Sequence, residues 1–306
     1  MMEKKIEMSA RERLISSSKN RKKDEVRGRL LVTICALIMI TATIAITIFL
    51  GTKGIQSFTS NGVSLIEFLT SSDWNPSEEK YGALPFIFGS FAVTILSALI
   101  AAPLGIGSAI FMTEIAPSWG RKFLQPVVEL LVGIPSVVYG FIGLTVLVPF
   151  IRNTFGGTGN SLLAGTIVLS VMILPTITTI ATDAMSSLPK NLREGSYALG
   201  ATRWQTIRKV LIPAALPTLL TAVVLGMARA FGEALAVQMV IGNVRALPDS
   251  LLDASATLTT IITLNMGHTT NGSVDNNALW SMGLILLVMS FLFIILIRYL
   301  SSRRKI

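Results

Sequence analysis

Cysteine, histidine and charged residues are all scarce in this chain of 306 residues. The one cysteine, Cys35, excludes an internal disulfide framework and a cysteine-based zinc site, and the one histidine, His268, argues against a histidine-rich metal centre. Charged residues make up 14% of the chain, against roughly a quarter in soluble domains, whereas hydrophobic residues make up 51%. The composition therefore argues against a water-soluble globular enzyme, and we expect no metal or other cofactor.

Sequence motifs for nucleotide hydrolysis and covalent catalysis are missing as well. No stretch has the Gly-x4-Gly-Lys-Ser/Thr spacing of a phosphate-binding loop. No serine or cysteine stands with the histidine in a recognisable nucleophile motif. We therefore expect a chain that is not an enzyme. If it takes part in an ATP-driven process, the hydrolysis of ATP belongs to a separate subunit.

Long apolar runs are what the sequence has in abundance. Each run provides 19 or more residues, and about 20 residues at about 1.5 Å rise cross a bilayer core as a helix. The runs are continuous rather than alternating, which excludes a closed barrel of strands. The sequence predicts an all-α membrane protein, a bundle of six transmembrane helices at residues 30–50, 86–112, 123–150, 161–182, 214–241 and 279–297.

The distribution of Lys and Arg predicts the orientation of these spans. The leader 1–29, the tail 298–306 and the two links on the same side of the membrane hold 21 Lys and Arg, and the three links on the other side hold 4. Positive residues are retained on the inner side, so both termini of the six-helix domain 30–297 are expected in the cytoplasm of a multi-pass plasma-membrane protein. This asymmetry accounts for the net charge of +9 without nucleic acid as a partner.

One cytoplasmic link, residues 183–213, is longer than a turn between two spans requires. Its first part is expected to be a short helix that begins near Pro189, because proline is tolerated in a first helical turn. Gly200 can end this helix in the left-handed conformation. The link therefore predicts ordered structure on the inner side of the membrane.

A second short helix is expected after that glycine. Thr202 and Gln205 have the spacing of a capping box, and the helix is expected to run to about Leu211. Pro213 is expected to prevent its continuation.

The first of these helices carries apolar residues on the watery side of the membrane, at Leu192, Tyr197, Ala198 and Leu199. An amphipathic helix of this kind either rests on the lipid interface or docks in a groove of another protein. The pattern alone does not decide between these two hypotheses.

The same segment resembles the "EAA" signature of ABC importer permeases, which reads Glu-Ala-Ala, three residues, Gly, nine residues, Ile-x-Leu-Pro. Here it reads Glu194-Gly195-Ser196, three residues, Gly200, nine residues, Val210-Leu211-Ile212-Pro213. The departures keep small or apolar character. In that family the segment is the coupling helix held by the cytoplasmic ATPase. The resemblance therefore implies a role in ATPase coupling for Glu194, Gly195, Ser196, Tyr197, Gly200 and Pro213.

Three further stretches, residues 103–114, 131–141 and 226–233, are similar to the permeases of phosphate importers. The basic leader and the Gly-Ile-Pro-Ser-Val-Val-Tyr-Gly run look more like the PstC type than the PstA type. This resemblance implies four kinds of partner: a PstA-like second permease, two PstB-like ATPases, a PstS-like extracytoplasmic phosphate-binding protein and the lipid bilayer. A PstA-type subunit, or a permease for sulfate or molybdate, is the alternative within this class.

Three charged residues, Glu129, Arg229 and Glu233, fall inside the predicted spans, where a charge is costly and is a functional candidate. An arginine cannot lose its proton, and its planar fork matches two phosphate oxygens. We therefore expect Arg229 to contact the substrate. Glu233 follows four residues later on the same helix face and is expected to be its counter-ion. A structural ion pair is the alternative.

The role of Glu129 stays open. The nearby break at residues 133–135, Gly-Ile-Pro, is expected to kink or pack a helix rather than to open it towards an anion. Two other classes of protein remain as alternatives. An ion-coupled secondary transporter would use Glu129 and Glu233 as proton relays. A membrane scaffold that transports nothing would have no use for buried charges.

Overall fold

The structure is a computed structural model that describes the backbone of residues 2–302 and the side chains of residues 25–295. The chain divides into two units, Met1–Thr52 and Lys53–Ile306. The first unit is the greater part of one long helix, α1 (Met2–Thr59). Most side chains of the predicted leader 1–29 lie outside the described residues.

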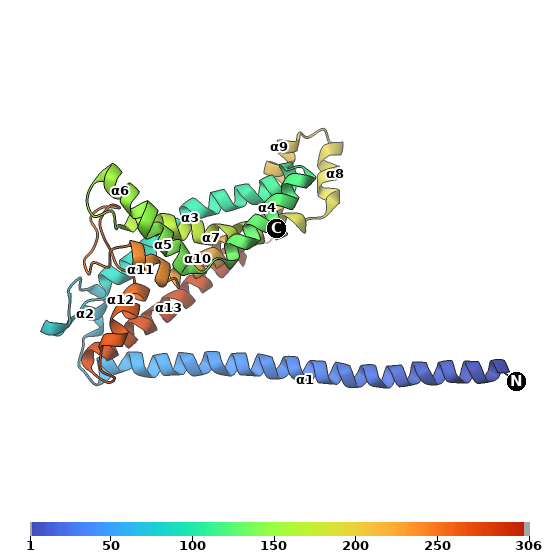
Figure 1. The fold of residues 1–306 in the computed structure, drawn as a ribbon, viewed down its shortest axis with the longest axis horizontal. Helices are drawn as coiled ribbons and strands as arrows, with labels where there is room; N and C mark the ends of the chain where they lie inside the picture. The colour runs from blue at the N-terminus through green and yellow to red at the C-terminus, as the bar shows by residue number, and fades with distance from the viewer. Residues whose placement is uncertain (1, 303–306) are drawn as a thin grey trace. The chain divides into compact units, whose positions relative to one another are not determined.

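The second unit is mostly helical (Figure 1). Its longer helices are α3 (Leu84–Ile110), α4 (Ser118–Gly133), α7 (Leu162–Ser186), α10 (Ile212–Phe231) and α13 (Val274–Ser302). Its shorter ones are α2 (Leu65–Thr70), α5 (Ser136–Ile142), α6 (Val148–Phe155), α8 (Lys190–Ala198), α9 (Arg203–Thr206), α11 (Leu235–Val240) and α12 (Leu258–Asn265). Strands β1 (Trp74–Asn75) and β2 (Lys80–Tyr81) pair antiparallel, with Trp74 opposite Tyr81.

Five short helices of other types complete the list of elements. Two are 3-10 turns, η1 (Pro76–Glu78) and η5 (Met266–His268). Three are π-helical turns within or next to the long helices, η2 (Phe111–Ile115), η3 (Gly143–Leu147) and η4 (Ile207–Leu211). π-Helical turns are rare, and they gather at functional sites.

In the part of the chain that the structure describes, six helices are long and apolar enough to cross a membrane, which confirms the predicted all-α membrane fold. They are Glu25–Thr59, Leu84–Ile115, Ser136–Phe155, Leu162–Ser186, Arg203–Phe231 and Val274–Ile295. Four of them contain the predicted runs or match them to within about five residues at each end. The third and the fifth do not.

The predicted third span, 123–150, is interrupted. Helix α4 ends at Gly133, Ile134 and Pro135 are extended, and α5 begins at Ser136. The expectation of a kink or a packing contact at this break is therefore wrong, because the helix ends outright. The residue before a proline favours the extended region, and Ile134 adopts it with a ψ of 127°.

The predicted fifth span, 214–241, begins and ends earlier than expected. A continuous helical stretch runs from Arg203 through η4 into α10, so the expectation that Pro213 stops the helix is wrong. Pro213 stands in the first turn of α10, directly after the wider turn of η4, and there its ring and missing N–H are tolerated. Helix α10 then ends at Phe231, and α11 begins only at Leu235.

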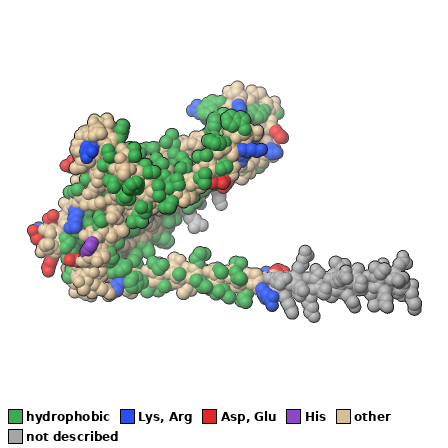
Figure 2. Space-filling view, in the orientation of Figure 1, with side chains coloured by type: hydrophobic (Ala, Val, Ile, Leu, Met, Phe, Trp, Pro, Cys, Tyr) green, Lys and Arg blue, Asp and Glu red, His purple; other side chains and the backbone are tan. Residues whose placement is uncertain are grey.

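The second unit has two ends, which we name by their contents. The coupling end carries α8 and α9, and the distal end carries α2, α6 and α12 (Figure 1). Hydrophobic side chains cover much of the visible face between these ends, while Lys, Arg, Asp and Glu gather towards them (Figure 2). This is the distribution expected of a bundle whose middle lies in lipid.

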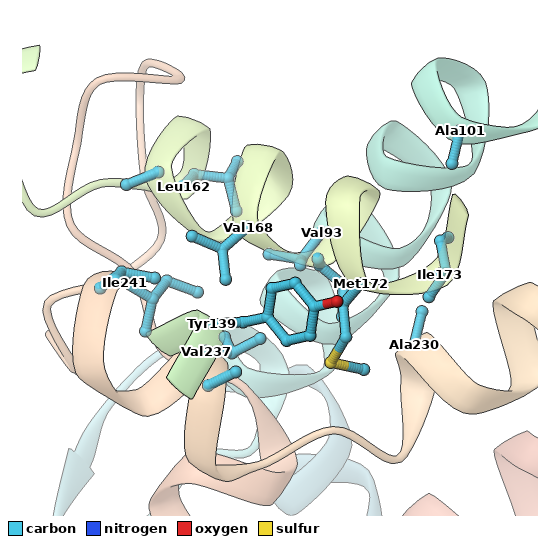
Figure 3. Close-up of a cluster of buried hydrophobic side chains, with 14 of the residues drawn as sticks. Val93, Ala101, Tyr139, Leu162, Val168, Met172, Ile173, Ala230, Val237 and Ile241 are labelled. Carbon is cyan, nitrogen blue, oxygen red and sulfur yellow. The ribbon is translucent and has the colours of Figure 1, made fainter. Parts of the chain in front are cut away.

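Three apolar clusters hold the unit together. The central cluster packs α3, α5, α7, α10 and α11 around Tyr139, Met172 and Val237 (Figure 3). A second cluster at the distal end is built on Phe68, Trp74, Tyr81 and Phe86. A third at the coupling end joins α3, α7 and the Ile207–Leu219 stretch, and Leu192 of α8 packs against it. Helix α8 is thus anchored on the spans by apolar burial.

Candidate functional site

The link between the fourth and fifth spans forms the elbow that the sequence predicts. Helix α8 ends in a reversal at Gly200, whose φ is +80°, the left-handed region that glycine adopts without strain. Gly200 N–H donates to Tyr197 O at 2.9 Å, and Ala201 N–H donates to Ser196 O at 3.2 Å. This is the pattern of hydrogen bonds that closes a helix C-terminus.

The second half of the elbow is capped as predicted. Gln205 N–H donates to Thr202 Oγ1 at 3.3 Å, and Thr202 N–H donates to Gln205 Oε1 at 2.9 Å. This capping box fixes the start of α9. The starts of the two helices and the glycine reversal between them are therefore confirmed, whereas the second helix does not end near Leu211.

Helix α8 has two different faces. Leu192, Arg193 and Ser196 are half-buried, whereas Glu194 and Tyr197 are exposed. Tyr197 is 45% exposed, and Leu199 next to the elbow is 90% exposed. The exposed face therefore offers a carboxylate and apolar surface together, the composition of a surface that docks on another protein.

The glycine and serine that follow Glu194 differ in their surroundings. A Cβ at Gly195 would meet nothing within 4 Å. Ser196 Oγ instead lies 2.9 Å from Thr206 Oγ1, the residue that closes α9. Ser196 therefore ties α8 to the base of the fifth span rather than to the exposed face.

Arg229 lies in the last turn of α10 and is half-buried. Its Nη1 donates to Thr176 Oγ1 of α7 at 2.9 Å, so the guanidinium is directed at a neighbouring span. A cation in the last turn of a helix is stabilised by the negative end of the helix dipole. The position therefore offsets part of the cost of a charge in the bundle.

Glu233 does not share a helix face with Arg229, because α10 ends before it. Its Oε1 accepts the N–H of Ala236 at 3.1 Å at the start of α11, and its backbone oxygen accepts from Thr259 Oγ1 at 2.8 Å. The prediction that Arg229 and Glu233 lie on one helix face is thus wrong. The break at Gly232 turns the two charges to two different helix ends.

Among the described side chains, the ion pairs within 4.0 Å are Lys80 with Asp73 and Glu78, and Arg193 with Glu114. Arg229 and Glu233 are not among them. Each is stabilised by the end of the helix it adjoins, because a carboxylate is favoured at an N-terminus as a cation is at a C-terminus.

Glu129 is exposed on α4, and its Oε1 accepts a hydrogen bond from Gln125 Nε2 at 3.1 Å. It lines a small polar pocket of about 190 Å³ together with Thr179, Thr182 and Asp183 of α7. This places Glu129 at the contact between α4 and α7.

Glu114 and Arg193 are not among the site residues that the sequence predicts. Glu114 lies in η2, just beyond the predicted second span, and is 8% exposed. Arg193 Nη2 lies 2.6 Å from its Oε1. The hydrogen bond to Glu114 raises the pKa of the Arg193 guanidinium above its usual range, against the lowering effect of burial. A carboxylate at the end of an apolar run and an arginine beside Glu194 were the available signals.

No group of three or more His, Cys, Asp or Glu side chains in the described part of the chain is placed to hold a metal ion.

The apolar spans and the capped elbow between two of them define a multi-span membrane protein with an ordered link between two spans. The family described as "Binding-protein-dependent transport system inner membrane component" matches residues 101–306. The chain belongs to this family and is a permease subunit of an ABC transporter.

Curated relatives agree with this assignment. The chain is 79% identical over its whole length to the "Probable ABC transporter permease protein YqgH" of Bacillus subtilis (strain 168), all of which it covers. It is 37% identical to the "Phosphate transport system permease protein PstC" of Mesorhizobium japonicum, with 86% of this chain and 87% of that protein covered. The protein of the same name in Xylella fastidiosa (strain 9a5c) is 34% identical, with 90% of each chain covered.

Solved structures share the fold. A bacterial alginate ABC transporter, in complex with an alginate-bound periplasmic protein, aligns with a TM-score of 0.60 at 18% identity, covering 92% of this chain and 96% of that chain. The inward-facing MetNI methionine ABC transporter aligns with a TM-score of 0.58 at 22% identity, covering 72% of this chain and 95% of that chain.

Membership of this family settles the class of protein. The chain is a multi-pass plasma-membrane subunit that is not itself an enzyme. Permeases of this family work with an ATPase and a substrate-binding protein, so partners of both kinds are implied.

Proposed function

We propose that this chain is the PstC-type subunit of an ATP-driven importer of inorganic phosphate. The observation that carries the proposal is Arg229, an arginine directed at another span within the bundle of a permease. The names of relatives at 34% to 37% identity support phosphate as the anion. The assembly would contain this chain, a PstA-like second permease, two PstB-like ATPases and a PstS-like phosphate-binding protein.

The chemistry of Arg229 suits an oxyanion. A guanidinium stays charged at any physiological pH, and its five N–H donors form a fork that matches two oxygens of one phosphate. Thr176 takes one of these donors and fixes the orientation of the group. A passing anion would then meet a cation that is already oriented.

Glu233 would act in the same pathway from the other side of the helix break. Its carboxylate is held by the N-terminus of α11. It would keep the local net charge near zero when no anion is present, so that phosphate is attracted without being trapped. In this proposal Glu233 balances Arg229 across the break and not through a direct contact.

The exposed face of α8 would receive the ATPase. Glu194, Gly195 and Tyr197 would contact a groove of the PstB-like subunit, while Gly200 sets the angle of the elbow. Closure of the two ATPases would displace α8 and rock one permease against the other, which gives alternating access. Both termini would lie on the ATPase side, the cytoplasm.

Uptake of labelled phosphate by the reconstituted complex tests the proposal. Substitution Arg229→Lys keeps the charge and removes the fork, and we expect uptake to fall by about tenfold or more, since a charge-assisted hydrogen bond contributes about 1.5–3 kcal/mol. The matched control is Arg245→Lys, a change of the same type at an exposed arginine of the distal end that donates to Asn265. Uptake by this control should stay normal.

Three outcomes would contradict the proposal in different ways. Normal uptake by an assembled Arg229→Lys complex would remove Arg229 from the pathway. Stronger competition by sulfate or molybdate than by unlabelled phosphate would assign another oxyanion. Uptake driven by a proton gradient in vesicles that contain this chain alone would indicate a secondary transporter.

A further inference from the structure

Arg193 makes most of the polar contacts between the coupling helix α8 and the spans. Arg193 is half-buried at the edge of the packed face of α8, whereas Glu194 and Tyr197 are exposed. Its Nη2 lies 2.6 Å from Glu114 Oε1, and its Nε donates to both carboxylate oxygens, at 3.2 and 3.3 Å. This forked contact fixes the angle between the two groups as well as their distance.

The same guanidinium also binds the end of a second span. Nη1 donates to Leu188 O at 3.2 Å, and Nη2 donates to Met185 O at 3.1 Å. These carbonyls belong to the C-terminus of α7 and the turn that follows, where helix carbonyls lack partners within the helix. One side chain of α8 therefore holds both the end of α7 and η2, the turn that continues α3.

The burial of Glu114 makes this connection hard to break. Glu114 is 8% exposed, and its partner comes from another element. If Arg193 moved away alone, a buried carboxylate would lose its partner, which is among the most costly changes in a protein interior. A displacement of α8 is therefore expected to carry η2 and the end of α7 with it.

The other polar connection of α8 is weaker. Ser196 and Thr206 share one neutral hydrogen bond at 2.9 Å, which links α8 to the start of the fifth span. A neutral hydrogen bond contributes less than a charge-assisted pair. If a partner displaces α8, we therefore expect the displacement to be transmitted to α3 and α7 more than to the start of the fifth span.

We propose that Glu114 and Arg193 form a strut that transmits the displacement of the coupling helix to α3 and α7. Both are positioning residues, since neither is expected to touch the anion or the nucleotide. The inference rests on the proposed function only in that ATP drives transport; it does not depend on which anion is carried. Without the strut, the ATPases would continue to cycle while the pathway follows them poorly.

The test is the number of anions imported per ATP hydrolysed, measured in proteoliposomes that hold the full complex and the binding protein. In Arg193→Lys, which keeps the charge and loses the fork, we expect this ratio to fall by about tenfold. Glu114→Gln should lower it as well. The ATPase should stay bound to the complex in both variants.

The matched control is Arg121→Lys at the start of α4. Arg121 lies at the same end of the bundle, is exposed, and donates a single hydrogen bond to Ser186 Oγ at 3.3 Å. Its ratio should equal that of the unaltered complex. If Glu114→Gln fails to assemble, Arg193→Lys carries the test alone, because it leaves the buried charge compensated.

An unchanged ratio in assembled Arg193→Lys would overturn the strut. So would a parallel loss of hydrolysis and uptake caused by release of the ATPase, since that would mean a damaged docking surface. Failure of the proposed function has a different signature: the unaltered complex itself would show no ATP-dependent import.

Discussion

Gly89 shows how closely the second span, helix α3, approaches the segment that precedes α12. A Cβ at this position would lie 2.1 Å from the backbone oxygen of Ala256 and 3.0 Å from Ser255 Oγ. Helix α3 therefore packs backbone against backbone with the segment before α12. Membrane helices commonly associate through small residues in this way, because lipid provides no hydrophobic force between them.

We predict that Gly89→Ala destabilises the protein by about 1–3 kcal/mol, because the backbone of Ala256 cannot move aside as a side chain would. The measurement is the temperature at which the detergent-solubilised protein loses its monodisperse peak. Gly107→Ala is the matched control on the same helix, since a Cβ there would meet nothing within 4 Å. Alanine is the better helix former, so the control should be unchanged or slightly more stable. Equal behaviour of the two variants would refute the close approach.

Single residues mark the limit of what the sequence predicts here. The spacing of Arg229 and Glu233 indicates one helix face only if the helix continues, and it ends at Phe231. Glu114 sits just outside an apolar run, so hydropathy gives no reason to pair it with Arg193, 79 residues later. Pairs of this kind depend on how the spans pack, and no local sequence pattern predicts that packing.

Short elements were predicted more reliably than long ones. The glycine reversal and the capping box of the elbow depend on hydrogen bonds within a few residues, and both are as expected. The limits of the third and fifth spans depend on how Pro135 and Pro213 are accommodated. Proline ends one helix and lies inside the other, because η4 provides a wider turn directly before Pro213.

The elbow itself gives a prediction about the element that meets the ATPase. A Cβ at Gly200 would meet nothing within 4 Å, so the constraint is the φ of +80° and not space. A β-branched side chain in this conformation costs about 1–2 kcal/mol, and asparagine costs less. We therefore expect Gly200→Val to lower the amount of ATPase that co-purifies with the complex by about fivefold or more.

Gly200→Asn is the matched variant, and it should retain nearly all of the ATPase. If valine and asparagine behaved alike, the left-handed turn would not be what positions α8. Thermal stability of the isolated permease should fall in the valine variant by no more than this strain of about 1–2 kcal/mol, since the residue is exposed and no apolar contact is lost.

The links rich in Lys and Arg lie together at one end of the second unit, and two of the links poor in them lie together at the other end, as their Lys and Arg counts predict. Arg121 of one basic link lines a pocket with Lys190 and Arg193 of another, at the coupling end. At the distal end, Phe68 and Trp74 pack with Leu258, which brings together two links that are poor in Lys and Arg. The sequence thus predicts which links share a side of the membrane, although their contacts follow only from the fold.

The last prediction concerns the side of the membrane on which the coupling end and the distal end lie. It follows from the distribution of Lys and Arg. Lys and Arg are retained in the cytoplasm during insertion, so the coupling end should face inward. In a Cys35→Ala background, Leu199→Cys at the coupling end and Asn271→Cys at the distal end are both exposed positions. A membrane-impermeant maleimide should label only the cysteine at 271 in intact cells and both after permeabilisation. Labelling of the cysteine at 199 in intact cells would invert the topology, and α8 would then lie out of reach of any cytoplasmic ATPase.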